Sequence, residues 1–129
     1  MRFLVDTHVF IWYVQSSDRL PSSVTAIIND GRNDILLSIA SVWEIAIKQS
    51  TGKLNIGTPY ASFISEQMRL NSMESLPVRL EHLDLITTLP LHHRDPFDRL
   101  LIAQSIVEDI LIISADRVFS LYPVRLMWE

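Results

Sequence analysis

The sequence predicts an α/β fold of three layers, α/β/α, in which helices cover both faces of a mostly parallel central sheet. Short apolar runs, typical of buried strands, alternate along the chain with helical patterns, and this alternation favours crossovers between parallel strands. The length of 129 residues suits one compact domain with its own core, and is too short for two of ordinary size. We therefore expect a single domain over residues 1–129.

The first third of the chain is expected to form one strand and two helices. Residues 3–5 make a continuous apolar run, as in a buried strand, and Asp6 can cap a helix that continues to Val14. The stretch 18–30 predicts a second helix, because Pro21 lies near its start and a glycine follows its end.

The middle of the chain repeats this order. Residues 35–39 form a second buried strand, after which Ser41 is expected to cap a helix that stops at Gly52. Residues 59–70 predict a further helix, and residues 73–78 predict a short strand that contains a proline near its end.

The last third is expected to contain two helices and two strands. Residues 79–89 suggest a helix, and another helix begins at Pro96 after a polar loop. Residues 110–113 are the fourth apolar run, and residues 124–128 are expected to form a final edge strand. The helix that begins at Pro96 should carry four apolar residues on its inner side: Leu100, Ala103, Ile106 and Val107.

Composition limits the classes of function. The formal net charge is -4, so no broad basic surface indicates nucleic-acid binding, although metal ions would invert the charge at an acidic site. The absence of cysteine excludes disulfides and thiolate metal sites. No signal-peptide pattern and no membrane-spanning apolar stretch are recognisable, which predicts a cytoplasmic protein without membrane association.

Four acidic residues each stand where a strand-like run gives way to a helix or turn: Asp6, Glu44, Asp98 and Asp116. In a parallel sheet the carboxyl ends of the strands meet at one edge, where α/β proteins bind their ligands. Carboxylate oxygens are the ligands that Mg²⁺ and Mn²⁺ prefer, and such ions can support hydrolysis of a phosphodiester. We therefore predict a divalent-metal site at this edge.

Each acid also has a purely structural alternative. Asp6 could cap the first helix, and Glu44 fits a capping box with the serine three residues before it. Asp95 suits the N-cap of the following helix, which places Asp98 in the first turn, where the helix dipole favours a carboxylate. Asp116 could stabilise a turn after the fourth apolar run.

Basic residues near these acids are candidate contacts to phosphate or RNA. Lys48 lies one helical turn after Glu44, and three arginines flank the third and fourth acids: Arg94, Arg99 and Arg117. Ordinary solvated charge balance is the alternative. The four histidines lack the helical spacing of a zinc site, and His92 and His93 are expected to be loop residues.

Residues 89–104, with the sequence LPLHHRDPFDRLLIAQ, closely resemble a signature of bacterial PIN-domain ribonucleases, the toxin halves of VapBC-type toxin-antitoxin pairs. Residues 4–8 (LVDTH), 38–48 (SIASVWEIAIK) and 113–116 (ISAD) resemble the remaining motifs of that family, in the same order. The resemblance therefore extends over the whole chain.

The resemblance implies a PIN-like fold, dependence on Mg²⁺ or Mn²⁺, endonucleolytic cleavage of an RNA substrate, a homodimer, and inhibition by a small cognate VapB-type antitoxin. It matches Asp6, Glu44, Asp98 and Asp116 to the metal-binding acids of the family, and Thr7 and Ser114 to hydroxyls that support them. Asp95, one helical turn before Asp98, is either a supporting acid or only the N-cap of its helix. A metal-carboxylate site favours attack by water, with a 5′-phosphate and a 3′-hydroxyl as products.

Two other classes of function share parts of this pattern. A phosphoacceptor receiver domain is also a small α/β protein, but it would need an acidic pair after the first strand and a lysine after the last. A non-catalytic interaction module would use its acids as caps, and its apolar segment 10–14 could then form a dimer or antitoxin surface, although burial in the core is the favoured explanation of that segment.

Overall fold

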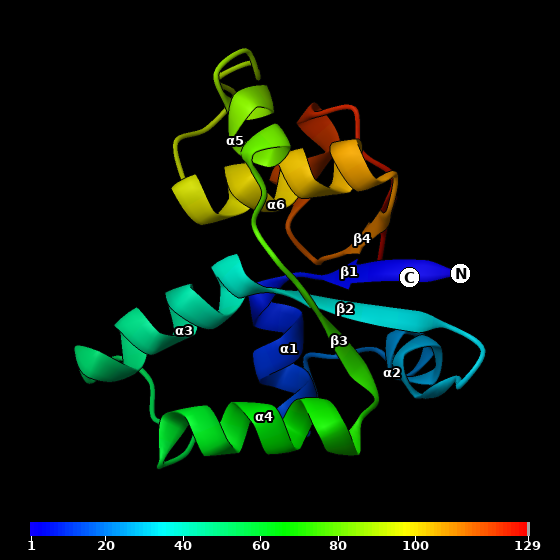
Figure 1. Ribbon diagram of the computed structural model, residues 1–129. Coiled ribbons are helices and arrows are strands. Elements are labelled where there is room, and N and C mark those ends of the chain that lie inside the picture. Colours follow the sequence, from blue (N-terminus) through cyan, green and yellow to red (C-terminus); the bar gives the residue numbers. More distant parts are fainter. Residues whose placement is uncertain (129) are drawn as a thin grey trace.

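The computed structural model describes residues 1–128 and forms a sheet flanked by helices (Figure 1). In chain order the elements are β1 (Arg2–Val5), α1 (Thr7–Val14), α2 (Ser22–Asn29), β2 (Asp34–Ser38), α3 (Ile39–Ser50), α4 (Tyr60–Leu70), β3 (Met73–Leu76), α5 (Leu80–Ile86), α6 (Pro96–Glu108), β4 (Leu111–Ile113), the 3₁₀ helix η1 (Arg117–Leu121) and β5 (Leu126–Met127).

The strands lie in the order β3-β2-β1-β4-β5, and all four neighbouring pairs are parallel, which confirms the predicted sheet. The register sets Val5 beside Leu37 on one side and beside Ile113 on the other. Because of this register, the residues that directly follow these three lie in line at the carboxyl edge of the sheet, and all are polar: Asp6, Ser38 and Ser114.

Two apolar cores, one on each face of the sheet, explain why the strands are apolar without alternation. Phe3 and Val5 of β1 belong to the core beneath α1, α2 and α4, whereas Leu4 belongs to the core that includes Leu101 and Ile102 of α6. Figure 1 shows α5 and α6 on one side of the sheet and α1, α2 and α4 on the other. The predicted three-layer α/β/α architecture is confirmed.

Ser38, and not Ser41, caps helix α3, so the predicted cap is wrong. Ser38 has the extended backbone of an N-cap, with φ -69° and ψ 143°, and its hydroxyl accepts a hydrogen bond from the Ala40 amide at 3.0 Å. The last residue of β2 already supplies the acceptor, so the helix begins three residues earlier than expected. Glu44 consequently lies in the second turn, outside any capping box.

Two further expectations need correction. Helix α2 begins at Ser22 and not near residue 18, because Pro21 holds the extended conformation of the N-cap. Val107 is 39% exposed and does not belong to the inner side of α6, whose buried residues run consecutively from Arg99 to Ser105. Within residues 1–128, none of the helices combines the length and the apolarity needed to cross a bilayer.

Candidate active site

The four predicted acids are carried by different elements that meet at the carboxyl edge of the sheet. Asp6 directly follows β1, and Asp116 comes three residues after the end of β4. Glu44 lies in α3 and Asp98 in the first turn of α6, and these two helices pack against each other. The packing of α3 against α6 thus brings the start of α6 near the carboxyl end of β1.

The pKa of Asp98 shows that these carboxylates share one small region. Burial is the largest cause that raises this pKa, from 3.8 to about 8, and the negative charges of Asp95, Asp6, Glu44 and Asp116 raise it further. Like charges have this effect only when they are close together, because water screens distant ones. The sequence prediction that the acids converge therefore agrees with the electrostatics of the folded chain.

Asp6 does not act as a helix cap. Its backbone occupies the N-cap position of α1, but its side chain makes no capping hydrogen bond. Instead the Ser114 hydroxyl donates to Asp6 Oδ2 at 2.7 Å. Burial raises the pKa of Asp6 and the charge of Glu44 adds to this, while the hydrogen bond from Ser114 opposes it. Ser114 thus lies where the predicted supporting hydroxyl should be.

Glu44 is buried beside a lysine. Its side chain is 11% exposed, and its Oε2 lies 3.2 Å from Lys48 Nζ, one helical turn later. Since Ser38 caps α3, the backbone does not require this carboxylate. A buried carboxylate without a capping role is unusual, because burial of charge costs free energy unless a partner compensates for it. Lys48 is that partner, which limits its freedom to contact a phosphate.

Asp98 is held by a histidine that the sequence analysis assigned only to a loop. His93 Nε2 lies 3.3 Å from Asp98 Oδ2, and His93 Nδ1 lies 2.8 Å from the Tyr122 hydroxyl. Asp95 caps α6 as predicted, since its Oδ1 accepts from the amides of Phe97 and Asp98 at 2.9 and 3.0 Å. Asp95 therefore caps the helix, and the carboxylate of Asp98 remains available for chemistry.

Asp116 does have the structural role considered as its alternative. Its Oδ1 accepts from the Val118 amide at 3.0 Å at the start of η1, and its own amide donates to Ser114 Oγ at 3.0 Å. Its charge nevertheless contributes to the raised pKa of Asp98. Asp116 therefore stabilises a turn and also belongs to the electrostatic cluster.

The carboxylate oxygens of the four acids suit a hard divalent cation, but the four side chains do not surround a common point in this structure. Among residues 1–128, no three carboxylate or imidazole groups lie in a metal-binding arrangement. One oxygen of each acid is engaged by a partner of its own. Their oxygen chemistry and mutual repulsion nevertheless fit Mg²⁺ or Mn²⁺, since a cation would neutralise the charge that raises the pKa of Asp98.

Two of the remaining predicted residues have other tasks. The hydroxyl of Thr7 donates to Ser41 Oγ at 2.8 Å, so it ties α1 to α3 and does not contact an acid in the structure. Arg99 was predicted to contact phosphate or RNA, but it is buried and donates to the carbonyl oxygens of Pro90 and Leu89 at 2.8 and 3.2 Å. Arg99 thus fixes the loop between α5 and α6. Arg94 and Arg117 remain exposed.

Replacing Arg99 by alanine is expected to lower the free energy of unfolding by about 3 kcal/mol, because buried carbonyl oxygens would lose charged donors. Urea denaturation followed by circular dichroism measures the change. The matched control is Arg94→Ala, on the surface of the same loop, which should alter stability by less than about 0.5 kcal/mol. Equal effects of the two substitutions would show that Arg99 does not hold the loop.

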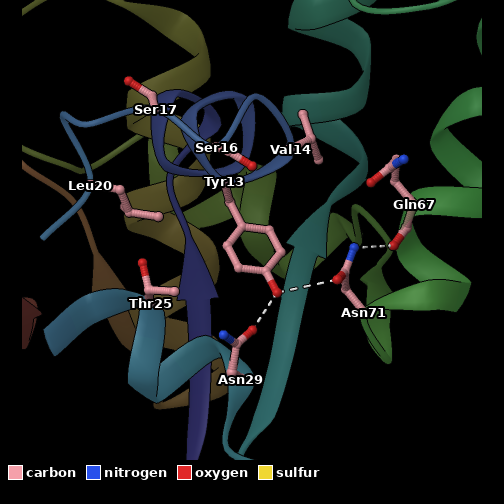
Figure 2. A pocket seen from close by; sticks show the side chains of 9 residues that line it. All are labelled: Tyr13, Val14, Ser16, Ser17, Leu20, Thr25, Asn29, Gln67 and Asn71. Carbon is pink, nitrogen blue, oxygen red and sulfur yellow. Dashed lines mark hydrogen bonds between the residues drawn. The ribbon is translucent and has the colours of Figure 1, made fainter. Parts of the chain in front are cut away.

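A separate hollow of about 490 Å³ lies between α1, α2 and α4 (Figure 2). Figure 2 shows Tyr13 extended between Asn29 and Asn71, and its hydroxyl lies within hydrogen-bonding distance of both amide groups. Burial raises the pKa of Tyr13. The residues that line this hollow are uncharged, unlike the four acids of the candidate active site.

Comparison with known proteins identifies a family whose model covers nearly the whole chain. The model of the PIN domain family matches residues 3–124. Ribonuclease VapC16 from Mycobacterium tuberculosis is 47% identical over 57 residues, which cover 44% of this chain and 40% of that protein. The chain thus spans less than half the length of this relative.

Solved structures with low sequence identity share the fold. The VapBC2 complex from Rickettsia felis, bound to a promoter DNA fragment, matches with a TM-score of 0.72 and 15% identity over 100% of both chains. The DNA-bound VapBC complex from Salmonella typhimurium matches with a TM-score of 0.70 and 14% identity, over 98% of this chain and 97% of that one. With the family model matching nearly its entire length, the chain belongs to the PIN domain family.

Proposed function

We propose that this protein is a metal-dependent endoribonuclease that acts in the cytoplasm as the toxin of a toxin-antitoxin pair. The observation that carries the proposal is the set of four acids at the carboxyl edge of a PIN-fold sheet, where burial, and then the neighbouring carboxylates, raise the pKa of Asp98 to about 8. Perturbed acids at the strand ends of an α/β sheet are typical of catalytic sites. The local similarity to a protein named as a ribonuclease supports RNA as the substrate.

The metal ion, Mg²⁺ or Mn²⁺, would be held by four acids: Asp6, Glu44, Asp98 and Asp116. It would supply positive charge that binds the scissile phosphate and lowers the pKa of a bound water. The chain's own contribution is to position these acids. Ser114 orients Asp6 through its hydrogen bond, and His93, supported by Tyr122, restricts the rotation of Asp98.

Incubation of the purified protein with total cellular RNA and Mg²⁺ should produce new RNA ends that carry 5′-phosphates and 3′-hydroxyls. Attack by water yields these ends, whereas attack by the ribose 2′-hydroxyl yields a cyclic phosphate. Ligation-based sequencing of the ends distinguishes the two products. Addition of EDTA should abolish cleavage, and cyclic-phosphate products or cleavage in EDTA would contradict the proposal.

The rival functions explain the site less well. A receiver domain needs a second acid after the first strand, but Asp6 is followed by Thr7, which is buried against Ser41. A module whose acids serve only as caps does not account for Asp6 or Glu44, since neither side chain caps a helix. Buried carboxylates that do not cap a helix favour a catalytic site over an interaction module.

We also propose a homodimer and a VapB-type antitoxin as partners. Exposed apolar side chains offer surface for both: Ile39, Trp43 and Ile47 follow one face of α3 at intervals of four residues and are 44, 60 and 40% exposed. Leu80 on α5 is 81% exposed. By contrast, Phe10 and Ile11 of segment 10–14 are buried, so this segment belongs largely to the core.

A further inference from the structure

Two hollows lie side by side along the edge that carries the acids. The first has a volume of about 300 Å³ and is lined by Asp6, His8, Trp12, Arg19, Ala115 and Asp116. The second has a volume of about 330 Å³ and shares Ala115 with the first; Ser114, Arg117 and Trp128 also line it. We call the two hollows together the aromatic track. It begins at two of the four acids and leads away from them past Ala115.

Aromatic rings form the walls of this track. His8 and Trp12 lie four residues apart and therefore share one face of α1, with ring centroids 6.0 Å apart. The Trp128 ring lies 6.0 Å from that of Trp12 at an interplanar angle of 56°. Because the two indoles are tilted and not stacked, each hollow keeps an aromatic wall of its own.

The indole of Trp12 is not required to fill the core. Val9, Phe10 and Ile11 already bury the inner side of α1, with exposed fractions of 0, 0 and 7%. Trp12 packs against this core but remains partly exposed, and it also lines the first hollow. An aromatic ring that closes one side of an open hollow beside an acidic site is well placed to stack on a flat ligand.

Two exposed arginines lie along the track. The Arg19 guanidinium lies 5.9 Å from the centre of the Trp12 ring, and both Arg19 and Arg117 are exposed. Neither forms an ion pair with any acid of residues 1–128, whose ion-paired arginines are Arg32, Arg69 and Arg125. Exposed guanidinium groups beside aromatic rings suit a phosphate chain with exposed bases.

We infer that the aromatic track binds single-stranded RNA next to the scissile phosphate, with a nucleobase stacked on Trp12 and neighbouring phosphates bound by Arg19 and Arg117. The inference rests on the proposed function, whose substrate it narrows. A duplex keeps its bases stacked on each other, so it cannot present a base face to Trp12. The track thus selects unpaired loops and single strands over helices.

Tryptophan fluorescence can report this stacking directly. The chain has three tryptophans, so Trp43→Phe and Trp128→Phe leave Trp12 as the single emitter, and Asp98→Asn in the same protein prevents cleavage. A single-stranded ten-nucleotide oligoadenylate should quench this emission saturably, because a stacked base quenches indole fluorescence. An abasic ribose-phosphate oligomer and an RNA duplex of the same length should leave the emission nearly unchanged.

Further substitutions in the Asp98→Asn protein test whether Trp12 binds RNA through its aromatic face or only fills space. Trp12→Leu keeps an apolar side chain but removes the aromatic face, and it should raise the Kd for oligoadenylate about 10-fold. Arg19→Ala should weaken binding and reduce the slope of log Kd against log salt concentration by roughly 0.7. Arg69→Ala, which removes an exposed arginine of α4, is the matched control and should change neither quantity.

The outcomes distinguish this inference from the proposed function. Cleavage of RNA by the wild type without quenching of Trp12, or with unchanged Kd in Trp12→Leu, would overturn the aromatic track and leave the nuclease proposal intact. Quenching by single-stranded RNA without cleavage under any metal condition would retain the track and overturn the nuclease proposal. Equal binding of duplex and single strand would also overturn the inference.

Discussion

Replacement of Asp98 by asparagine is expected to lower the rate of RNA cleavage on the order of a thousandfold, the effect typical of losing a group that stabilises transition-state charge. The free energy of unfolding in the absence of metal should rise near pH 7. With a pKa of about 8, Asp98 is mostly protonated in the folded protein at that pH but ionised in the unfolded chain, and asparagine removes this cost while it resembles the neutral acid in shape. RNA cleavage assays and urea denaturation measure the two quantities.

Asp95 provides the matched control on the same helical turn. Asp95→Ala removes the acceptor of two backbone amides, so it should lower the free energy of unfolding by about 0.5 to 2 kcal/mol while much of the cleavage activity remains. Replacement of Asp98 should therefore reduce activity and not stability, whereas replacement of Asp95 should reduce stability more than activity. If Asp98→Asn were the more destabilising change and retained activity, Asp98 would serve only the helix dipole.

Mg²⁺ should raise the melting temperature of the wild type and leave that of the Asp6→Asn, Asp98→Asn double variant unchanged. A ligand present at a hundredfold excess over its Kd stabilises the folded state by about 2.7 kcal/mol. Differential scanning fluorimetry with and without Mg²⁺ measures this shift, and chelation by EDTA should reverse it together with activity. The same response in both proteins would exclude the acids as the binding site.

The rise in melting temperature that Mg²⁺ causes should also increase with pH. The pKa of Asp98 in the folded protein, about 8, lies above its ordinary value of 3.8, so the folded state keeps a proton that the unfolded chain releases between these values. Stability without metal therefore falls as pH rises from about 4 to 8. A cation must displace that proton, so the melting shift should be larger at pH 8 than at pH 6, unless Asp98 is replaced.

The pattern of apolar runs was sufficient to predict the layers and the parallel sheet, because a strand buried on both faces must be apolar throughout. It also placed the acids, since a parallel sheet brings its strand ends to one edge. Two serines near the start of α3 could each cap a helix, and only the folded backbone shows that Ser38 has the required extended conformation.

Side-chain partners were not predictable, because they depend on contacts between distant residues. His93 meets Tyr122 across 29 positions, and nothing in the local sequence indicates that contact. The orientation of Arg99 was more accessible. It precedes Ile102 and Ala103 by three and four residues, so it shares their buried face of α6, whereas the neighbouring Asp98 points toward the acid cluster. Helical periodicity applied to charged residues would have shown this difference.

The order of strands in the sheet has a consequence for the cell that makes this protein. β1 lies at the centre of the sheet, yet its neighbour β4 is among the last elements to be translated, and Ser114 follows Asp6 by 108 positions. A nascent chain therefore lacks half of its acid cluster until nearly all of it has left the ribosome. If the proposed nuclease activity depends on all four acids, the nascent chain would be unable to cut the message and the ribosome that are still producing it.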